Sequence, residues 1–88
     1  MSWSVDLSHS AEKDLKRFSR DIRERMLRAI DELQADPFRG DVKPLKGAAW
    51  KGRYRKRVGA YRIIFTPDYH AQRVLVSAVL IRSEKTYR

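Results

Sequence analysis

Two β-prone runs, residues 53–58 and 60–66, meet at Gly59 and constrain the fold of this 88-residue chain more than any other feature. Glycine is the residue best suited to a tight reversal, so the two runs are predicted to form a β-hairpin closed by a two-residue turn. Val58 then pairs with Tyr61 across the turn. This register decides the face on which every other side chain of the hairpin lies.

Because side chains alternate along a strand and paired residues share a face, the hairpin has two chemically different faces. One face carries Tyr54, Lys56, Val58, Tyr61, Ile63 and Phe65. The other carries Arg53, Arg55, Arg57 and Arg62. The aromatic and aliphatic face can cover a core, whereas four exposed guanidinium groups repel one another unless an anion is present.

Two amphipathic helices are predicted before the hairpin. Residues 3–7 alternate with period two, as in a half-buried strand, and Ser8 can then cap a helix. Its apolar stripe is Ala11, Leu15 and Phe18. Ser19 can cap a second helix, which ends at Asp36 and Pro37. The stripe of that helix is Ile22, Met26, Ala29, Ile30 and Leu33.

The remaining segments complete a small α+β domain. Residues 39–49 are expected to be irregular, and residues 73–81 are apolar on both faces, as in a central strand. No repeat or linker divides the chain, so residues 1–88 are predicted to form one domain. We expect a helical hairpin packed on one face of a small antiparallel sheet, in the order β-α-α-β-β-β.

Composition disfavours several kinds of site. There is no cysteine, and His9 and His70 are the only histidines, so we expect no disulfide, no metal site and no cofactor. Neither histidine lies in a recognisable hydrolase pattern. The chain begins without a leader pattern and contains no run of about 20 apolar residues, so we expect a cytoplasmic protein with no membrane partner.

Residues 42–66 contain eight basic side chains and no acidic one. Residues 1–41 hold eight basic and nine acidic side chains, whereas residues 42–88 hold twelve basic and two acidic ones. Trp50, Tyr54 and Tyr61 are interleaved with the basic residues. This pattern favours a polyanionic partner, with nucleic acid as the leading candidate.

Arginine can act on a phosphodiester in two ways. Its planar donors match phosphate oxygens, and they can stabilise the extra charge of a pentacoordinate transition state formed when a 2′-hydroxyl attacks. The same side chains serve a passive binding surface equally well. Composition alone leaves both readings open.

Three stretches of the second half form a recognisable pattern: Leu45-Lys46-Gly47 with Trp50, the run from Gly52-Arg53-Tyr54-Arg55 through Val58-Gly59-Ala60-Tyr61-Arg62 to Phe65, and the closing Arg82-Ser83-Glu84-Lys85-Thr86-Tyr87-Arg88. In these residues the sequence resembles the RelE/ParE superfamily of bacterial and archaeal toxins. The resemblance implies a RelE-like fold and a metal-free endoribonuclease that cuts mRNA, in many members at the ribosomal A site. It also implies a cognate antitoxin, with mRNA and the ribosome as further partners.

Position by position, the resemblance assigns residues to a site. The implied catalytic residues are Arg53, Arg55, Arg62, Arg82 and Tyr87. The RNA-binding candidates are Lys46, Lys51, Arg57 and Lys85. Some RelE toxins have lysine at two positions that are arginine here, and arginine is almost never deprotonated. The general base therefore stays open between Tyr87, water and a ribosomal group.

Two other functions are compatible with the same residues. ParE-like toxins share this fold, act on DNA gyrase and do not need the catalytic set. A non-catalytic module that binds RNA or the ribosome could also use the basic face. Four arginines on one face and a terminal tyrosine favour the RNA-cleaving branch.

Overall fold

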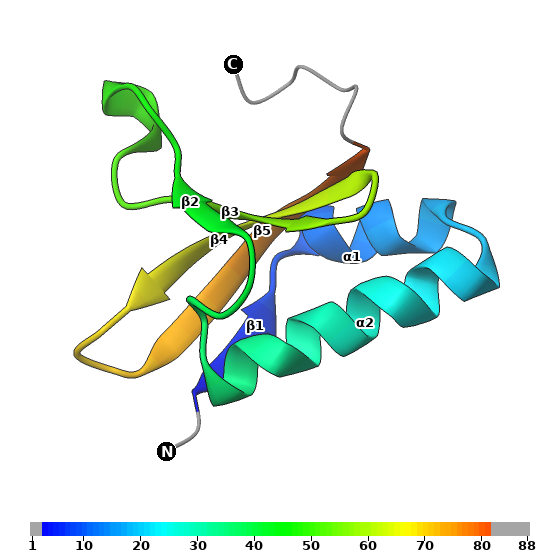
Figure 1. Ribbon diagram of the computed structural model, residues 1–88, viewed down its shortest axis with the longest axis horizontal. Coiled ribbons are helices and arrows are strands. Elements are labelled where there is room, and N and C mark those ends of the chain that lie inside the picture. Colours follow the sequence, from blue (N-terminus) through cyan, green and yellow to red (C-terminus); the bar gives the residue numbers. More distant parts are fainter. Residues whose placement is uncertain (1–2, 82–88) are drawn as a thin grey trace.

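Two helices cover one face of a five-stranded sheet in the computed structural model, which describes residues 3–81 (Figure 1). The elements are β1 (Ser4–Leu7), α1 (His9–Arg17), α2 (Arg20–Ala35), β2 (Val42–Pro44), a short 3₁₀ helix η1 (Ala48–Trp50), β3 (Tyr54–Val58), β4 (Tyr61–Asp68) and β5 (Arg73–Ile81). Within residues 3–81, no helix is long and apolar enough to cross a membrane.

The strand order is β1-β5-β4-β3-β2, which confirms the predicted α+β class. Strands β3 to β5 pair antiparallel, as expected, and β2 also pairs antiparallel with β3. Strand β1 instead pairs in parallel with β5, so the sheet is mixed. Strand β2 lies within the segment predicted to be irregular. Its three residues pair with β3 and add a fifth strand at the edge of the sheet.

Both helices begin at the predicted serines. The Ser8 Oγ accepts a hydrogen bond from the Ala11 amide at 3.1 Å, and the Ser19 Oγ accepts one from the Ile22 amide at 3.5 Å. Each bond satisfies one of the backbone donors that a helix start leaves without a partner. Asp36 ends α2, as the following proline predicts.

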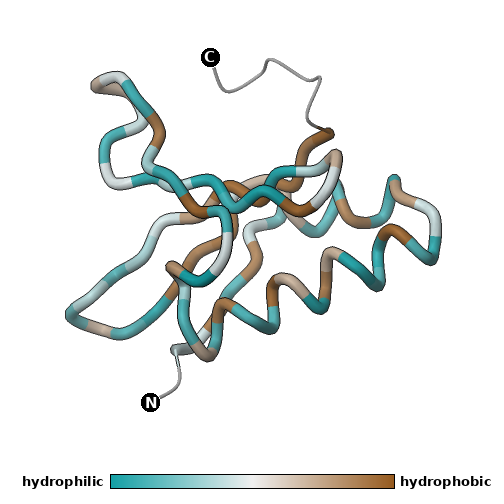
Figure 2. The backbone as a smooth tube through the Cα atoms, viewed as in Figure 1, coloured by the Kyte–Doolittle hydropathy of each residue, from teal (hydrophilic) through white to brown (hydrophobic). Residues whose placement is uncertain are grey.

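The core lies between the helices and the covered face of the sheet. It includes Ala11, Leu15, Met26, Ile30, Leu33, Ile63, Phe65, Val74, Val76 and Val79. Tyr54, Val58 and Tyr61 pack against it, as the hairpin register predicts. Figure 2 shows hydrophobic residues recurring at intervals along α2 and concentrated along β5.

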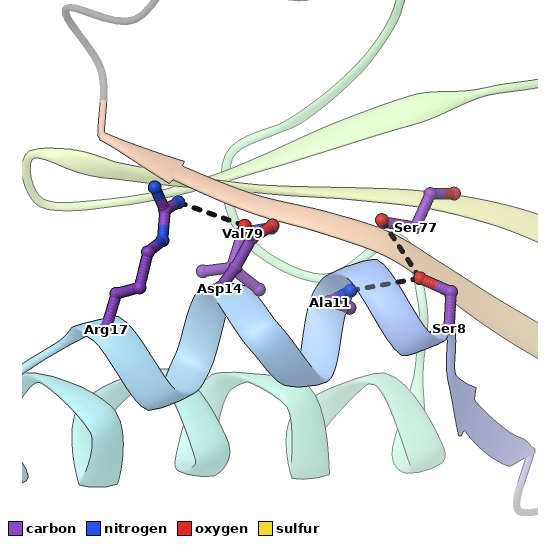
Figure 3. Close-up of polar contacts among 6 residues, drawn as sticks. All are labelled: Ser8, Ala11, Asp14, Arg17, Ser77 and Val79. Atoms are coloured by element: carbon purple, nitrogen blue, oxygen red, sulfur yellow. Dashed lines mark hydrogen bonds and ion pairs between the residues drawn. The ribbon is translucent and has the colours of Figure 1, made fainter.

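Helix α1 covers the edge of β5 beyond the end of β1 (Figure 3). The Ser8 hydroxyl donates to the Ser77 carbonyl at 3.0 Å, and the Asp14 carboxylate accepts from the Val79 amide at 2.9 Å. These side chains replace the backbone partners that a longer β1 would supply. They protect a strand edge that could otherwise pair with another chain.

Candidate functional site

The basic site is built on the β3–β4 hairpin, whose register is the predicted one. Val58 pairs with Tyr61, Arg57 with Arg62 and Arg55 with Ile64. Gly59 has φ +59° and Ala60 is not in the positive-φ region, as in a type II′ turn. Arg55 and Arg57 therefore lie on the sheet face opposite the helices.

Arg57 and Arg62 face each other on adjacent strands. The Arg57 amide donates to the Asp41 carbonyl at 2.9 Å, so the N–H of Arg57 points away from β4. Arg57 and Arg62 are therefore a non-hydrogen-bonded pair, the geometry that brings opposing side chains closest together. Both side chains are half-buried. Two cations held opposite each other favour an anion between or beside them.

One such anion comes from the chain itself. Asp41, which immediately precedes β2, places Oδ1 3.2 Å from the Arg55 Nη1 and Oδ2 3.8 Å from the Arg57 Nε. The first contact is a hydrogen bond, and the second is an ion pair without one. Arg55 also donates to the Asp41 carbonyl at 3.4 Å. The side chain of Arg55 is only 12% exposed.

The charges around Asp41 lower its pKa. The main cause is the hydrogen bond from Arg55, and the positive charges of Arg55, Arg57 and Lys43 add to it, whereas desolvation acts in the opposite direction. Among the described residues, the Arg57 Nε is buried and has no hydrogen-bond acceptor. Asp41 thus neutralises part of the cluster and leaves one donor of Arg57 unsatisfied.

Lys56 is the one cation of the hairpin that points toward the helices, as its register predicts. It is 3% exposed, and its Nζ lies 2.7 Å from the Oε1 of Glu32 on α2. The pair lies beside a pocket of about 320 Å³ between α2 and the β2–β3 edge. The pocket is lined by Arg25, Arg28, Ala29, Glu32, Gly40, Asp41, Lys56, Arg57 and Val58.

The loop between β2 and β3 carries the other basic candidates. Lys46, Lys51 and Arg53 are all exposed. The Arg53 guanidinium lies 5.3 Å from the centroid of the Trp50 ring, which fixes it against an aromatic face. Arg53 precedes the first residue of β3.

The structure brings together Arg55, Arg57 and Arg62 on one face of the hairpin. The sequence predicts four exposed arginines there. Arg53 is exposed but lies in the loop, and Arg55 is mostly buried because β2 and Asp41 lie against it. Arg57 and Arg62 keep the predicted face but are half-buried. Arg82, Lys85 and Tyr87 lie outside the described residues.

Sequence reasoning missed Asp41. It lies one position before the acid-free block, in the nearly neutral first half of the chain. The signal that could have found it is a third strand paired with β3, because the register Lys43 to Arg55 places Asp41 beside Arg57. No group of three or more acidic or histidine side chains able to hold a metal occurs among residues 3–81.

Solved structures share this fold. The chain is similar to the RelBE2 toxin-antitoxin complex of Mycobacterium tuberculosis, with 25% identity, a TM-score of 0.83, and coverage of 93% of this chain and 100% of that one. The RelB-RelE complex of Methanococcus jannaschii is 30% identical, with a TM-score of 0.68 and coverage of 86% of this chain and 88% of that one. The RelE-RelB complex of Pyrococcus horikoshii is 23% identical, with a TM-score of 0.78 and coverage of 97% of this chain and 100% of that one.

A comparison with curated proteins gave no match. The family model described as the ParE toxin of the type II toxin-antitoxin system parDE matches residues 5–86. That span includes both helices and all five strands, apart from Ser4, the first residue of β1. The chain therefore belongs to the ParE toxin family, within the RelE/ParE superfamily of type II toxins.

Proposed function

We propose that this toxin is an endoribonuclease that cleaves mRNA without a metal ion. The observation that carries the proposal is the arrangement of Arg55, Arg57 and Arg62 on the face of the hairpin that the helices leave open. Three guanidinium groups on two paired strands match the charge and donor geometry of a phosphodiester. The solved structures of RelE proteins with the same fold support the RNA-cleaving branch.

The proposed reaction is attack of the substrate 2′-hydroxyl on the adjacent phosphate. The products are a 2′,3′-cyclic phosphate and a 5′-hydroxyl. Arg57 and Arg62 would bind the non-bridging oxygens and stabilise the negative charge that develops on them. Because arginine stays protonated, proton transfer falls to another group, and Tyr87 is the candidate that the resemblance supplies.

Arg53 and Trp50 extend the proposed interface along the loop before β3. A guanidinium stacked on an indole presents both charge and a planar surface to single-stranded RNA. Lys46 and Lys51 would contact flanking phosphates, which adds affinity without sequence preference. Arg82 and Lys85 are proposed for the same interface from the resemblance alone.

A cognate antitoxin is the proposed inhibitor. The relatives named above were solved as toxin-antitoxin complexes, and the present chain carries a net charge of +9. An acidic partner segment would be attracted to the hairpin and could cover the arginines. Co-expression of the neighbouring small gene should relieve growth arrest, and continued arrest would count against this partner.

The direct test is cleavage of RNA by purified protein in EDTA, with and without ribosomes. The cut ends are mapped by primer extension and their 2′,3′-cyclic phosphates are identified chemically. Arg62→Ala and Tyr87→Phe should lower the rate far more than the melting temperature. Arg73→Ala is the matched control, because Arg73 is an exposed arginine at the far end of β5. Full toxicity of both site variants would refute the assignment.

Inhibition of DNA gyrase is the second candidate, and the match to the ParE family model favours it. In that case the arginine face would bind a protein or DNA, and no phosphodiester would be cut. Supercoiling by purified gyrase separates the two functions. Loss of supercoiling with RNA left intact would select the gyrase-directed toxin.

A further inference from the structure

Asp41 lies on the arginine face of the hairpin and supplies an anion there from within the chain. Its carboxylate oxygens contact two different arginines, at 3.2 Å from the Arg55 Nη1 and 3.8 Å from the Arg57 Nε. A carboxylate resembles a phosphate in presenting several oxygens to a guanidinium fork. The carboxylate thus satisfies, within the chain, part of the charge that would bind a ligand.

The contacts of Asp41 are incomplete. The distance to Arg57 is too long for a hydrogen bond, and the buried Nε of Arg57 has no acceptor among the described residues. The side chain of Asp41 is 44% exposed, whereas those of Arg55 and Arg57 are 12% and 33% exposed. Asp41 can therefore swing into solvent without unpacking the sheet, and a larger anion with more oxygens could satisfy both arginines at once.

Resting on the proposed function above, we propose that Asp41 is an internal competitor for the phosphate site formed by Arg55 and Arg57. In the free toxin its carboxylate holds the position that a backbone phosphate of the ligand takes on binding. The ligand class is a single-stranded nucleic-acid phosphate. Asp41 weakens binding of this class, and it keeps two arginines from repelling each other when no ligand is present.

The opposite role for Asp41 would be to position the two arginines for the ligand. The two roles predict opposite changes in the affinity for the ligand when the charge of Asp41 is removed. If Asp41 competes, removing its charge strengthens binding, because the site no longer has to expel a carboxylate. If Asp41 positions the arginines, removing its charge weakens binding, because both side chains lose their order.

The experiment compares Asp41→Asn with the wild-type chain. The probe is a fluorescein-labelled single-stranded oligodeoxynucleotide, which lacks the 2′-hydroxyl and cannot be cut by the proposed reaction, and binding is followed by fluorescence anisotropy. Asparagine keeps the shape of the side chain and removes one charge. A unit charge about 5 Å from a bound phosphate in a solvent-exposed site changes the dissociation constant by roughly fivefold to fifteenfold. We expect Asp41→Asn to bind that much more tightly.

Asp31→Asn is the matched control, because it makes the same change in net charge on the exposed surface of α2. It should bind within about twofold of the wild type, since salt screens the charge of an exposed side chain that makes no contact with Arg55 or Arg57. Unchanged or weaker binding by Asp41→Asn relative to this control overturns the proposal, as does the absence of measurable binding by Asp41→Asn. Far-UV circular dichroism melts show whether each variant is folded.

The same variants separate this proposal from the proposed function. Tighter binding by Asp41→Asn, with no cleavage of RNA by the wild type, would support Asp41 as a competitor and refute the endoribonuclease. Cleavage of RNA by the wild type, with no gain in affinity on removing the Asp41 charge, would support the endoribonuclease and refute the role of Asp41 as a competitor.

Discussion

Removal of Glu32 should destabilise the protein more than removal of its partner Lys56. The side chain of Lys56 is only 4% exposed, and its Nζ lies 2.7 Å from the Glu32 Oε1. Glu32→Ala would leave a buried ammonium group without its counter-ion. Lys56→Met would leave only a carboxylate that is 55% exposed and can be hydrated.

The expected magnitude lies between two limits. Breaking a fully buried ion pair by removing one partner costs about 3–5 kcal/mol, and an exposed pair contributes about 0.2–1 kcal/mol. With one member buried and the other half exposed, we expect Glu32→Ala to cost about 2 kcal/mol. For a domain of this size that lowers the melting temperature by roughly 8–16 °C. Lys56→Met should cost less than about 1 kcal/mol.

Thermal unfolding followed by far-UV circular dichroism at pH 7 measures both variants, with urea unfolding as the second measurement. Asp31→Ala on the exposed side of α2 is the control and should change stability by less than about 0.5 kcal/mol. The reasoning would be refuted if Glu32→Ala lost no more stability than this control. It would also be refuted if Lys56→Met lost more stability than Glu32→Ala.

The pH dependence gives a further test of the same pair. The hydrogen bond from Lys56 is the main cause that lowers the pKa of Glu32 from its ordinary value of 4.5, and the charge of Lys56 adds to it. A lowered pKa stabilises the folded state above the unfolded pKa, and that stability is lost as the pH falls through the folded pKa. The difference between wild type and Glu32→Ala should therefore be constant near neutral pH and narrow below about pH 4.5. A difference that grows on acidification would contradict the ion pair.

Three further changes test the fold around the site. Gly59→Ala should cost about 1–2 kcal/mol by urea unfolding, because φ at this position is +59° and alanine is strained there. Asp14→Ala should cost about 1–2 kcal/mol because the amide of Val79 loses its acceptor, whereas Asp14→Asn, which keeps an acceptor, should cost less. Ser8→Ala should lower the melting temperature more than Ser19→Ala, because Ser8 both caps a helix and donates to a strand carbonyl; equal losses would exclude that second role.

The hairpin and the helices could be predicted from the sequence because their signals are local. Gly59 fixes the turn, and the turn fixes the register, so the separation of Ile63 and Phe65 from the arginines follows from alternation alone. The helix starts follow in the same way from Ser8 and Ser19, whose side chains bond within three residues.

The parallel pairing of β1 with β5 could not be predicted in this way. It joins Ser4 to Arg73, and no local pattern near either residue specifies the partner or its direction. Strand β2 was missed for a related reason. It has three residues, includes Pro44, and becomes a strand only because β3 lies beside it.

The burial of Arg55 follows from that missed strand. A hairpin without β2 would leave Arg55 at the edge of the sheet and open to solvent. With β2 in place, Lys43 lies directly opposite Arg55, and Asp41 closes over its guanidinium. A tertiary contact therefore changed the accessibility of a candidate site residue, while its face was set by the local register.

The separation of charge along the sequence is partly cancelled in the fold. The first half of the chain, which is nearly neutral, supplies an acid to each face of β3: Glu32 to Lys56 under the helices, and Asp41 to Arg55 and Arg57 on the open face. The two acids have different surroundings and should have different consequences. Glu32 compensates a cation that cannot reach solvent, so its removal should appear in stability. Asp41 compensates cations beside an open surface, so its removal should appear in the affinity for an anion, because a phosphate that approaches Arg55 and Arg57 would have to displace a carboxylate already present.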